Sequence, residues 1–320
     1  MLNRLIRNLI LFLIVLVVIA TIVITLLPTN QDHYMFALKD KHERLASISS
    51  PKIVIIGGSN TAFGVDSKLI QNRLNRPVAN MGLHLDLRIN YMINEVKPFL
   101  KEGDMVILIP EYSHLFRSPT SGNTKAFHKA VEVYPSAIKY LDLREQLRYS
   151  LNTYVSILQS KLNSILLNGG IVESEIVENN KNVYRRSSYD ELGDMIAHLN
   201  RSSIGFDKND DNFNNLKGKN INPEFCETIN SFKKFADEKA ISFLISFPPT
   251  PQSMFNEDVS KEIYTEFDEN IKVPLINTPE DFVYGDSLFF DTRYHLVSSS
   301  RESRTLKLIS SIQRNLSLND

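Results

Sequence analysis

The sequence predicts an α/β protein with a doubly wound parallel sheet, preceded by one membrane-spanning helix. Short apolar runs at residues 53–56, 105–110 and 241–247 alternate with stretches whose apolar residues recur at helical spacing. This alternation is typical of parallel βαβ units. The runs are rich in β-branched residues, which favours strands that are buried on both faces of a sheet. A long uncharged segment at residues 9–27 comes before all of them.

The amino-terminal segment predicts a membrane anchor. Residues 9–27 carry no charge and only two threonines. A helix of this length can cross a hydrocarbon core of roughly 30 Å. Arg4 and Arg7 precede it, so the positive-inside rule predicts a cytoplasmic amino terminus and an extracytoplasmic remainder. A cleaved signal peptide is the alternative, but its apolar core is shorter and LLPTNQDH offers no small-x-small cleavage site. We expect an uncleaved single-pass anchor over residues 1–28, in the cell membrane.

A polar juxtamembrane segment is expected at residues 29–50, where residues 33–45 suit either a short helix or a spacer. One extracytoplasmic domain is then expected over residues 51–320. Further strands are predicted at residues 77–82 and 273–277, and helices at residues 67–74, 87–100, 223–239, 263–270 and 303–316.

The turn after the first strand carries a candidate nucleophile. Gly57 and Gly58 end the strand, and Ser59 follows at once. A strand–turn–helix unit places Ser59 at the carboxyl edge of the sheet, where ligands of open α/β proteins bind. A serine there can act as a nucleophile, and helix-starting N–H groups nearby can stabilise an anion. The alternative is a glycine turn that happens to contain a serine.

A long insertion is predicted at residues 116–220. Residues 137–167 read as largely helical, and residues 173–219 are rich in Asn, Ser and Asp. An insertion of this length is either a lid or partner surface, or an inert excursion that covers the domain's own core. The predicted helix has a one-sided apolar stripe made of Leu141, Leu143, Leu147, Leu151, Val155, Leu158, Leu162 and Leu166.

The stretch FFDTRYHL near the carboxyl end supplies an acid and a base. Asp291 and His295 lie after the last predicted strand, where the chain returns to the carboxyl edge of the sheet. A histidine can take the proton of a serine while a carboxylate fixes its tautomer and stabilises the imidazolium. The alternative for such a pair is an exposed ion pair or a helix cap.

Composition excludes several other classes of site. The formal net charge is −1 with mixed signs, which gives no sign of a nucleic-acid surface. Cys226 is the only cysteine, so the chain has neither an intrachain disulfide nor a multi-cysteine metal site. The seven histidines show no metal-ligand spacing, and no metal or other cofactor is expected.

Together these residues resemble the SGNH (GDSL-like) hydrolase superfamily. GGSN is similar to its first block, with Ser59 at the nucleophile position; NMGL is similar to the second, with Gly82 at the oxyanion-hole glycine. DTRYHL is similar to the last block, with Asp291 and His295 completing the triad. The third strand ends in PEYSH without the asparagine of the third block, and three residues rather than two separate the acid from the histidine. The side chain of Asn60 or the N–H of Ser59 is expected to supplement the oxyanion hole.

The resemblance covers residues 52–316 apart from the insertion, and it implies a flavodoxin-like fold and an acyl-serine intermediate. With the anchor, the chain looks like the DltD-type and alginate O-acetylation-type accessory proteins of cell-envelope acylation. That likeness implies an esterase or O-acyltransferase acting on an acylated glycan or another cell-envelope polymer, beside a membrane-bound O-acyltransferase. Two alternatives remain. One is a catalytically silent scaffold for such an acyltransferase. The other is Rossmann-like nucleotide binding at the glycine turn, although this turn lacks the third glycine of GxGxxG.

Overall fold

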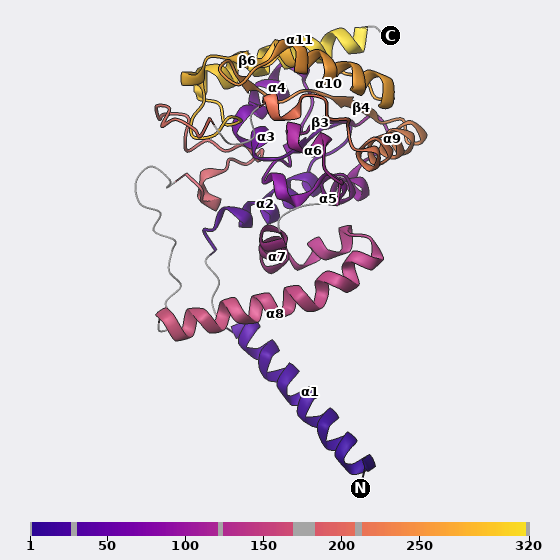
Figure 1. The fold of residues 1–320 in the computed structure, drawn as a ribbon, viewed down its shortest axis with the longest axis vertical. Helices are drawn as coiled ribbons and strands as arrows, with labels where there is room; N and C mark the ends of the chain where they lie inside the picture. Colours follow the sequence, from indigo (N-terminus) through magenta and orange to yellow (C-terminus); the bar gives the residue numbers. More distant parts are fainter. Residues whose placement is uncertain (1, 27–30, 121–123, 169–182, 209–212, 318–320) are drawn as a thin grey trace.

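The protein is described by a computed structural model that covers residues 2–26, 31–120, 124–168, 183–208 and 213–317 (Figure 1). The end of the expected anchor, residues 27–28, and two parts of the Asn-, Ser- and Asp-rich stretch of the expected insertion, residues 173–182 and 209–212, lie outside these ranges.

The sheet has four parallel strands in the order β2-β1-β3-β4, so the predicted mixed α/β architecture with a parallel sheet is confirmed. These strands are β1 (Ile53–Gly57), β2 (Val78–Asn80), β3 (Met105–Ile109) and β4 (Ser242–Ile245). The fifth predicted strand is only a single parallel bridge between Ile245 and Leu275. Pro274 interrupts it, because a proline has no N–H to give to the ladder. A separate short pair joins β5 (Thr250–Pro251) to β6 (Val283–Tyr284).

The apolar strands alternate between two cores. In β1, Val54 and Ile56 point into the larger core, whereas Ile53 and Ile55 point into the smaller one on the other face. Successive side chains of a strand face opposite sides, so a continuous run of β-branched residues serves both cores at once. The carboxyl ends of β1 and β3 lie side by side, with Gly57 paired to Ile109.

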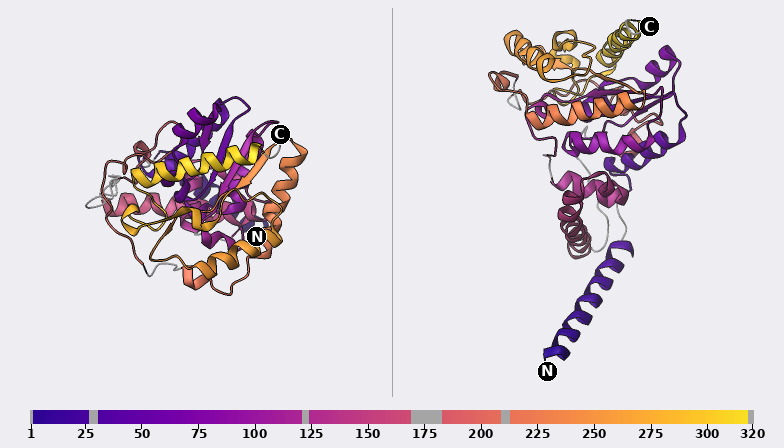
Figure 2. Two further views of the ribbon diagram at one scale, coloured as in Figure 1. Left: turned by 90° about the horizontal axis from the view of Figure 1, so that it is seen from above. Right: turned by 90° about the vertical axis from the view of Figure 1, so that its right-hand side faces the viewer.

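Helices cover both faces of the sheet. The larger core receives side chains from α5 (Ile89–Val96), α9 (Pro223–Glu238) and α10 (Glu257–Asn270). The smaller core receives Ile70 of α4 (Ser67–Leu74) and three residues of α11 (Ser298–Ser317). Figure 2 shows α11 and α9 on opposite sides of the strands.

The helix starts follow local sequence signals. The Asp66 side chain accepts from Leu69 N–H at the start of α4, and Asn222 and Asn256 cap α9 and α10 in the same way. Each satisfies an N–H group that has no intrahelical partner.

Part of the expected juxtamembrane segment belongs to the core. Helix α2 (Ala37–Ser47) buries Leu38 and Leu45 in the larger core. Lys41 Nζ is buried in the same helix and donates to the carbonyl oxygen of Asn80 at 2.9 Å, at the end of β2. Burial lowers the pKa of Lys41 to about 8, against the opposing effect of nearby carboxylates.

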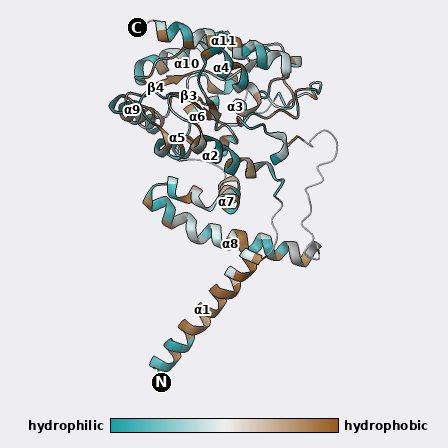
Figure 3. Cartoon of the chain, turned by 180° about the vertical axis from the view of Figure 1, so that it is seen from behind, coloured by the Kyte–Doolittle hydropathy of each residue, from teal (hydrophilic) through white to brown (hydrophobic). Residues whose placement is uncertain are grey.

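The amino-terminal helix α1 (Leu2–Leu26) projects from the rest of the molecule, and none of its residues is buried (Figures 1 and 3). It is long and apolar enough to cross a membrane. Helix α7 (Thr124–Val133) lies beneath the sheet domain, and the long helix α8 (Leu143–Asn168) lies across the carboxyl end of α1.

Candidate functional site

Ser59 is the first residue of the short helix α3 (Ser59–Gly64), directly after β1. Gly58 separates the two elements and is the N-cap of the helix. As the first residue of α3, Ser59 contributes an N–H group that has no partner within the helix. The Ser59 residue is half-buried, so the predicted strand–turn–helix places it at the carboxyl edge of the sheet with partial access to solvent.

Asp291 and His295 form a hydrogen-bonded acid–base pair in the segment before α11. His295 Nδ1–H donates to Asp291 Oδ1 at 2.7 Å. The three residues between them are accommodated by a turn in which His295 N–H reaches the carbonyl oxygen of Thr292. The longer spacing therefore leaves the acid in contact with the base, and it leaves His295 Nε2 as the nitrogen that can accept a proton.

The imidazole of His295 stacks on α3. The ring of Phe63 lies parallel to it, with 3.7 Å between ring centroids and 6° between planes. Ser59 and Phe63 are four residues apart in one helix, so they share a face of α3. The helix that begins with the candidate nucleophile thus presents the same face to the candidate base.

Tyr184 is a site residue that the sequence did not reveal. Its hydroxyl donates to Asp291 Oδ2 at 2.5 Å, so both oxygens of the acid have a partner. Burial raises the pKa of Asp291, but the hydrogen bond from His295 and that from Tyr184 outweigh it and hold the pKa below its ordinary value. The carboxylate is therefore ionised over the physiological range. Tyr184 lies in a polar stretch with no motif, and no sequence signal identified it.

The segment that carries Tyr184 is fastened beside the site. Arg186 binds the Asp40 carboxylate of α2 through two hydrogen bonds of 2.6 and 2.7 Å. His198 packs on Phe63 with ring centroids 4.7 Å apart, and its Nε2 pairs with the carbonyl oxygen of Leu296 at 3.0 Å. Burial, followed by the neighbouring charges of His295 and Arg301, lowers the pKa of His198 to about 3. A neutral His198 therefore packs against the site.

Two of the predicted oxyanion-hole donors are engaged elsewhere. Gly82 N–H donates to Asn80 Oδ1 at 2.9 Å, and the Asn60 side chain donates to the carbonyl oxygen of Ile109 at 3.1 Å. Asn60 is fully buried within α3, and its side-chain amide contacts the end of β3 in this structure, so its part in the oxyanion hole stays a prediction. The N–H of Ser59 is the predicted donor that remains.

Gly82 has a steric role of its own. A Cβ atom there would lie 2.6 Å from Cβ of Thr61 and 2.9 Å from the backbone N of Ala62. The chain after β2 is thus pressed against α3, and only glycine fits. Glycine at this position is explained by close backbone approach.

Glu111 belongs to the PEYSH stretch at the end of the third predicted strand. It follows β3, is 1% exposed, and caps the short helix α6 (Tyr112–Leu115) through His114. Its carboxylate reaches the nucleophile turn, because a Cβ at Gly58 would lie 2.4 Å from Glu111 Oε1. The side chain packed against the turn at Gly58 is therefore a carboxyl group and not an amide.

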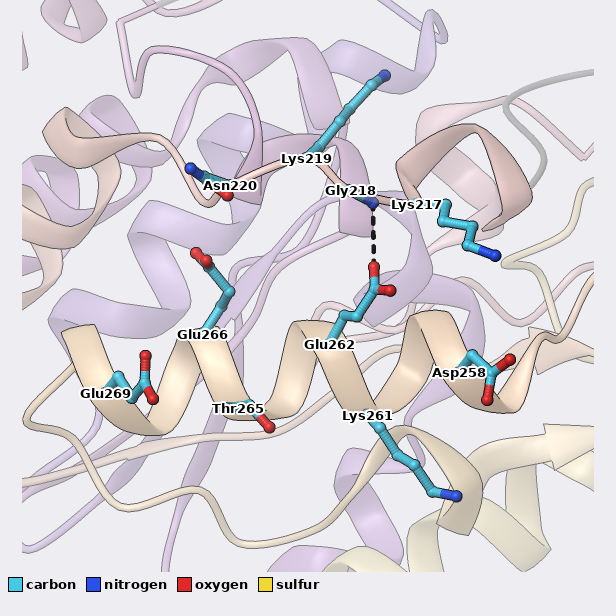
Figure 4. Close-up of a pocket in the computed structure, with 10 residues that line it drawn as sticks. All are labelled: Lys217, Gly218, Lys219, Asn220, Asp258, Lys261, Glu262, Thr265, Glu266 and Glu269. Atoms are coloured by element: carbon cyan, nitrogen blue, oxygen red, sulfur yellow. Dashed lines mark hydrogen bonds between the residues drawn. The ribbon is translucent and has the colours of Figure 1, made fainter.

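An open, charged groove of about 620 Å³ lies elsewhere, between α10 and residues 217–220 (Figure 4). Its α10 wall is acidic, and Glu262 accepts a hydrogen bond from Gly218 N–H at 3.0 Å. Glu266 accepts from Ile221 N–H in the same manner. These bonds fasten the segment to the helix, and neither Ser59 nor His295 lines the groove.

Within the part of the chain that the structure describes, no cluster of three or more His, Cys, Asp or Glu residues is placed to hold a metal ion. No protein-family model matches the chain, and no curated protein matches it.

Proposed function

We propose that this chain is a membrane-anchored serine esterase or O-acyltransferase of the SGNH type. Ser59 is the nucleophile, His295 the base and Asp291 the residue that orients the base. The strand order β2-β1-β3-β4, with a bridge beyond β4, supports the flavodoxin-like form of the doubly wound fold. The site lies at the carboxyl edge of that sheet.

The stacking of His295 on Phe63 is the observation that carries the proposal. An acid–histidine pair alone is common as a structural ion pair. Here the pair is held against α3, the short helix that starts with Ser59, one turn after that serine. This arrangement supports the assignment of nucleophile, base and orienting acid to Ser59, His295 and Asp291.

The chemistry follows from these roles. His295 Nε2 accepts the proton of Ser59 Oγ as that oxygen attacks the ester carbonyl. The Ser59 N–H, at the amino end of α3, donates to the oxyanion; one such donor is worth about 3–4 kcal/mol. Collapse expels the alcohol, which takes the proton from His295 and leaves an acyl-serine. Water or a sugar hydroxyl then accepts the acyl group by the reverse steps.

The anchor gives the proposed place of this chemistry. If α1 crosses the cell membrane with Arg4 and Arg7 on the cytoplasmic side, the domain faces outward. Its acyl acceptor or donor is then an acylated glycan or another cell-envelope polymer, and a membrane-bound O-acyltransferase is its proposed partner. A reporter fused after Ser50 should be active only outside the cytoplasm.

Acyl-enzyme detection tests the proposal. Full-length protein in detergent is offered 4-nitrophenyl acetate, quenched in acid and analysed by mass spectrometry of its peptides. We expect an added acetyl group on the peptide containing Ser59, and none in Ser59→Ala. Asp291→Asn should lose nearly as much turnover as His295→Ala, because an amide presents the wrong hydrogen-bond partner to the histidine. An unmodified wild-type peptide would refute the proposed activity.

A silent scaffold is the second candidate, and one observation favours it. The N–H of Gly82 and the amide of Asn60 are both engaged within the fold, and the PEYSH stretch lacks the third-block asparagine. An oxyanion hole with one donor stabilises the transition state less. If neither an acyl-enzyme nor ester turnover is found while glycan acylation in cells still needs the chain, the scaffold function is correct.

A further inference from the structure

Helix α8 presents its apolar side away from the rest of the protein. Five apolar side chains on this side of α8 are exposed to solvent in the described part of the chain, so they do not cover the domain's own core. The exposed apolar residues are Leu143 at 71%, Leu147 at 70%, Val155 at 50%, Leu162 at 39% and Leu166 at 79%. At 3.6 residues per turn they fall within an arc of roughly 140° on one side of the helix.

The opposite side of α8 is fixed to the domain. Arg88, which is 1% exposed, donates to Glu145 Oε1 at 2.9 Å and to the Tyr149 hydroxyl at 2.7 Å. Its guanidinium also lies over the ring of Tyr149, 4.8 Å from the centroid. Thr153, one turn further along, is buried as well. These contacts fix the rotation of the helix about its own axis, so the apolar side is held outward.

The same helix touches α1 within its apolar segment. The Tyr154 hydroxyl lies 3.1 Å from the carbonyl oxygen of Val17 and 3.1 Å from Thr21 Oγ1. Figures 1 and 2 show α8 lying across α1 at this end. Thr21 lies five residues before the end of α1 at Leu26, which is roughly 7.5 Å along the helix axis.

We infer that α8 is a membrane-surface helix whose outward apolar side lies in the outer leaflet of the bilayer that α1 crosses. An interfacial helix buries its apolar side about 5–10 Å below the headgroup boundary, which matches the depth at which Tyr154 meets α1. The lipid that surrounds α1 at Val17 and Thr21 therefore also meets α8. The inference rests on the membrane placement of α1 in the proposed function, and it does not depend on the ester chemistry.

The residues beside the apolar side fit a lipid interface. Arg144 is exposed and falls on the outward side near Leu147, where a long cationic side chain reaches lipid phosphates while its stem stays in apolar surroundings. Asn152 and Asn163 are exposed at the edge of the apolar side. Two helices that meet in one leaflet, one crossing it and one lying in it, fix the orientation of the whole domain against the membrane.

A matched pair of labels tests this placement. Leu162 and Asn163 are neighbours, and both are exposed, but only Leu162 belongs to the outward apolar side. Each is changed to cysteine in full-length Cys226→Ser protein and labelled with the environment-sensitive dye NBD. The protein is reconstituted in phosphatidylcholine–phosphatidylglycerol vesicles that contain lipids with a nitroxide on the acyl chain. Val15→Cys in α1 reports on the anchor.

We expect blue-shifted emission at Leu162→Cys, and quenching about twofold or more stronger than at Asn163→Cys. Equal, water-like signals at both positions, with Val15→Cys quenched, would overturn the inference while the anchor stands. An unquenched Val15→Cys would remove the anchor and this inference together, and the acyl-enzyme assay would still decide the proposed activity. Shielding of Leu162→Cys in native membranes but not in vesicles would show a protein partner instead, which also overturns it.

Discussion

Replacing Tyr184 with phenylalanine removes one hydroxyl from the candidate site and leaves its ring in place. That hydroxyl donates to Asp291 Oδ2, while His295 holds Oδ1. A hydrogen bond to a charged group contributes about 1.5–3 kcal/mol net. The Asp291 side chain is 12% exposed, so water replaces part of the lost bond and the lower value applies. About 1.4 kcal/mol of lost transition-state stabilisation is a tenfold fall in kcat/KM.

The pH profile gives this prediction its direction. Burial raises the pKa of Asp291, and the bonds from His295 and Tyr184 lower it below its ordinary value. Losing the Tyr184 hydroxyl removes one of the lowering effects, so the pKa of the carboxyl rises. The acid limb of kcat/KM for 4-nitrophenyl acetate should therefore move to higher pH in Tyr184→Phe. Because the hydroxyl acts through Asp291, KM should change little.

Tyr189→Phe is the matched control. Tyr189 lies in the same segment, but its ring packs against Lys41 Nζ, 4.8 Å from the centroid. It should keep the wild-type rate and pH profile. A Tyr184→Phe protein that equals wild type in both, while Asp291→Asn is inactive, would refute the positioning role. An equal loss in Tyr189→Phe would show that the segment matters only for stability.

Three other substitutions test the site and the fold. Ser59→Ala should abolish ester turnover in a spectrophotometric assay and change the free energy of unfolding by less than about 0.5 kcal/mol, because it creates no large cavity. Gly82→Ala should destabilise by about 1–3 kcal/mol in urea unfolding, since its Cβ would overlap Thr61. Asp104→Asn should cost about 3–5 kcal/mol, because it leaves Lys52 buried without the partner that lies 2.8 Å away. Burial raises the pKa of Asp104, but the hydrogen bonds from Lys52 lower it by more. The Asp104 carboxylate therefore stabilises the wild-type fold above about pH 4, and this stabilisation is lost as the pH falls further. The Asp104→Asn protein should lack this pH dependence.

The sequence predicted the parts of the fold whose patterns are local. The run of residues 53–56 indicated a strand buried on both faces, and β1 occupies it with its side chains in two cores. The carboxyl-terminal helical spacing indicated α11, which extends a few residues beyond the prediction at its start. The strand predicted at residues 273–277 was wrong in extent, because the prediction used the apolar pattern alone. Pro274 has no N–H group to donate to the neighbouring strand, so only a single bridge forms.

The sequence predicted those contacts of the candidate site that join residues close together in the chain. It did not predict the contacts that join distant segments. Asp291 and His295 are close in sequence, and their hydrogen bond follows from a turn. Tyr184 reaches the acid from 107 residues away. Which groups the Gly82 N–H and the Asn60 amide contact depends on how β2 and β3 meet α3, and no spacing in the sequence encodes that.

The expected insertion of residues 116–220 contributes residues to the candidate site and to the contact with α1. Its later described part, from residue 183, brings Tyr184 to the acid and is tied to α2 through Arg186 and Asp40. Its earlier part contains α8, which meets α1 at Tyr154 and is held to the domain by Arg88. Under our proposals the two parts differ in polarity because Tyr184 places a hydroxyl on a carboxylate, whereas α8 faces lipid. In our proposals the part that carries Tyr184 completes the site and the part that contains α8 orients that site against the membrane, whereas the expectation of a lid, a partner surface or an inert excursion stays a prediction.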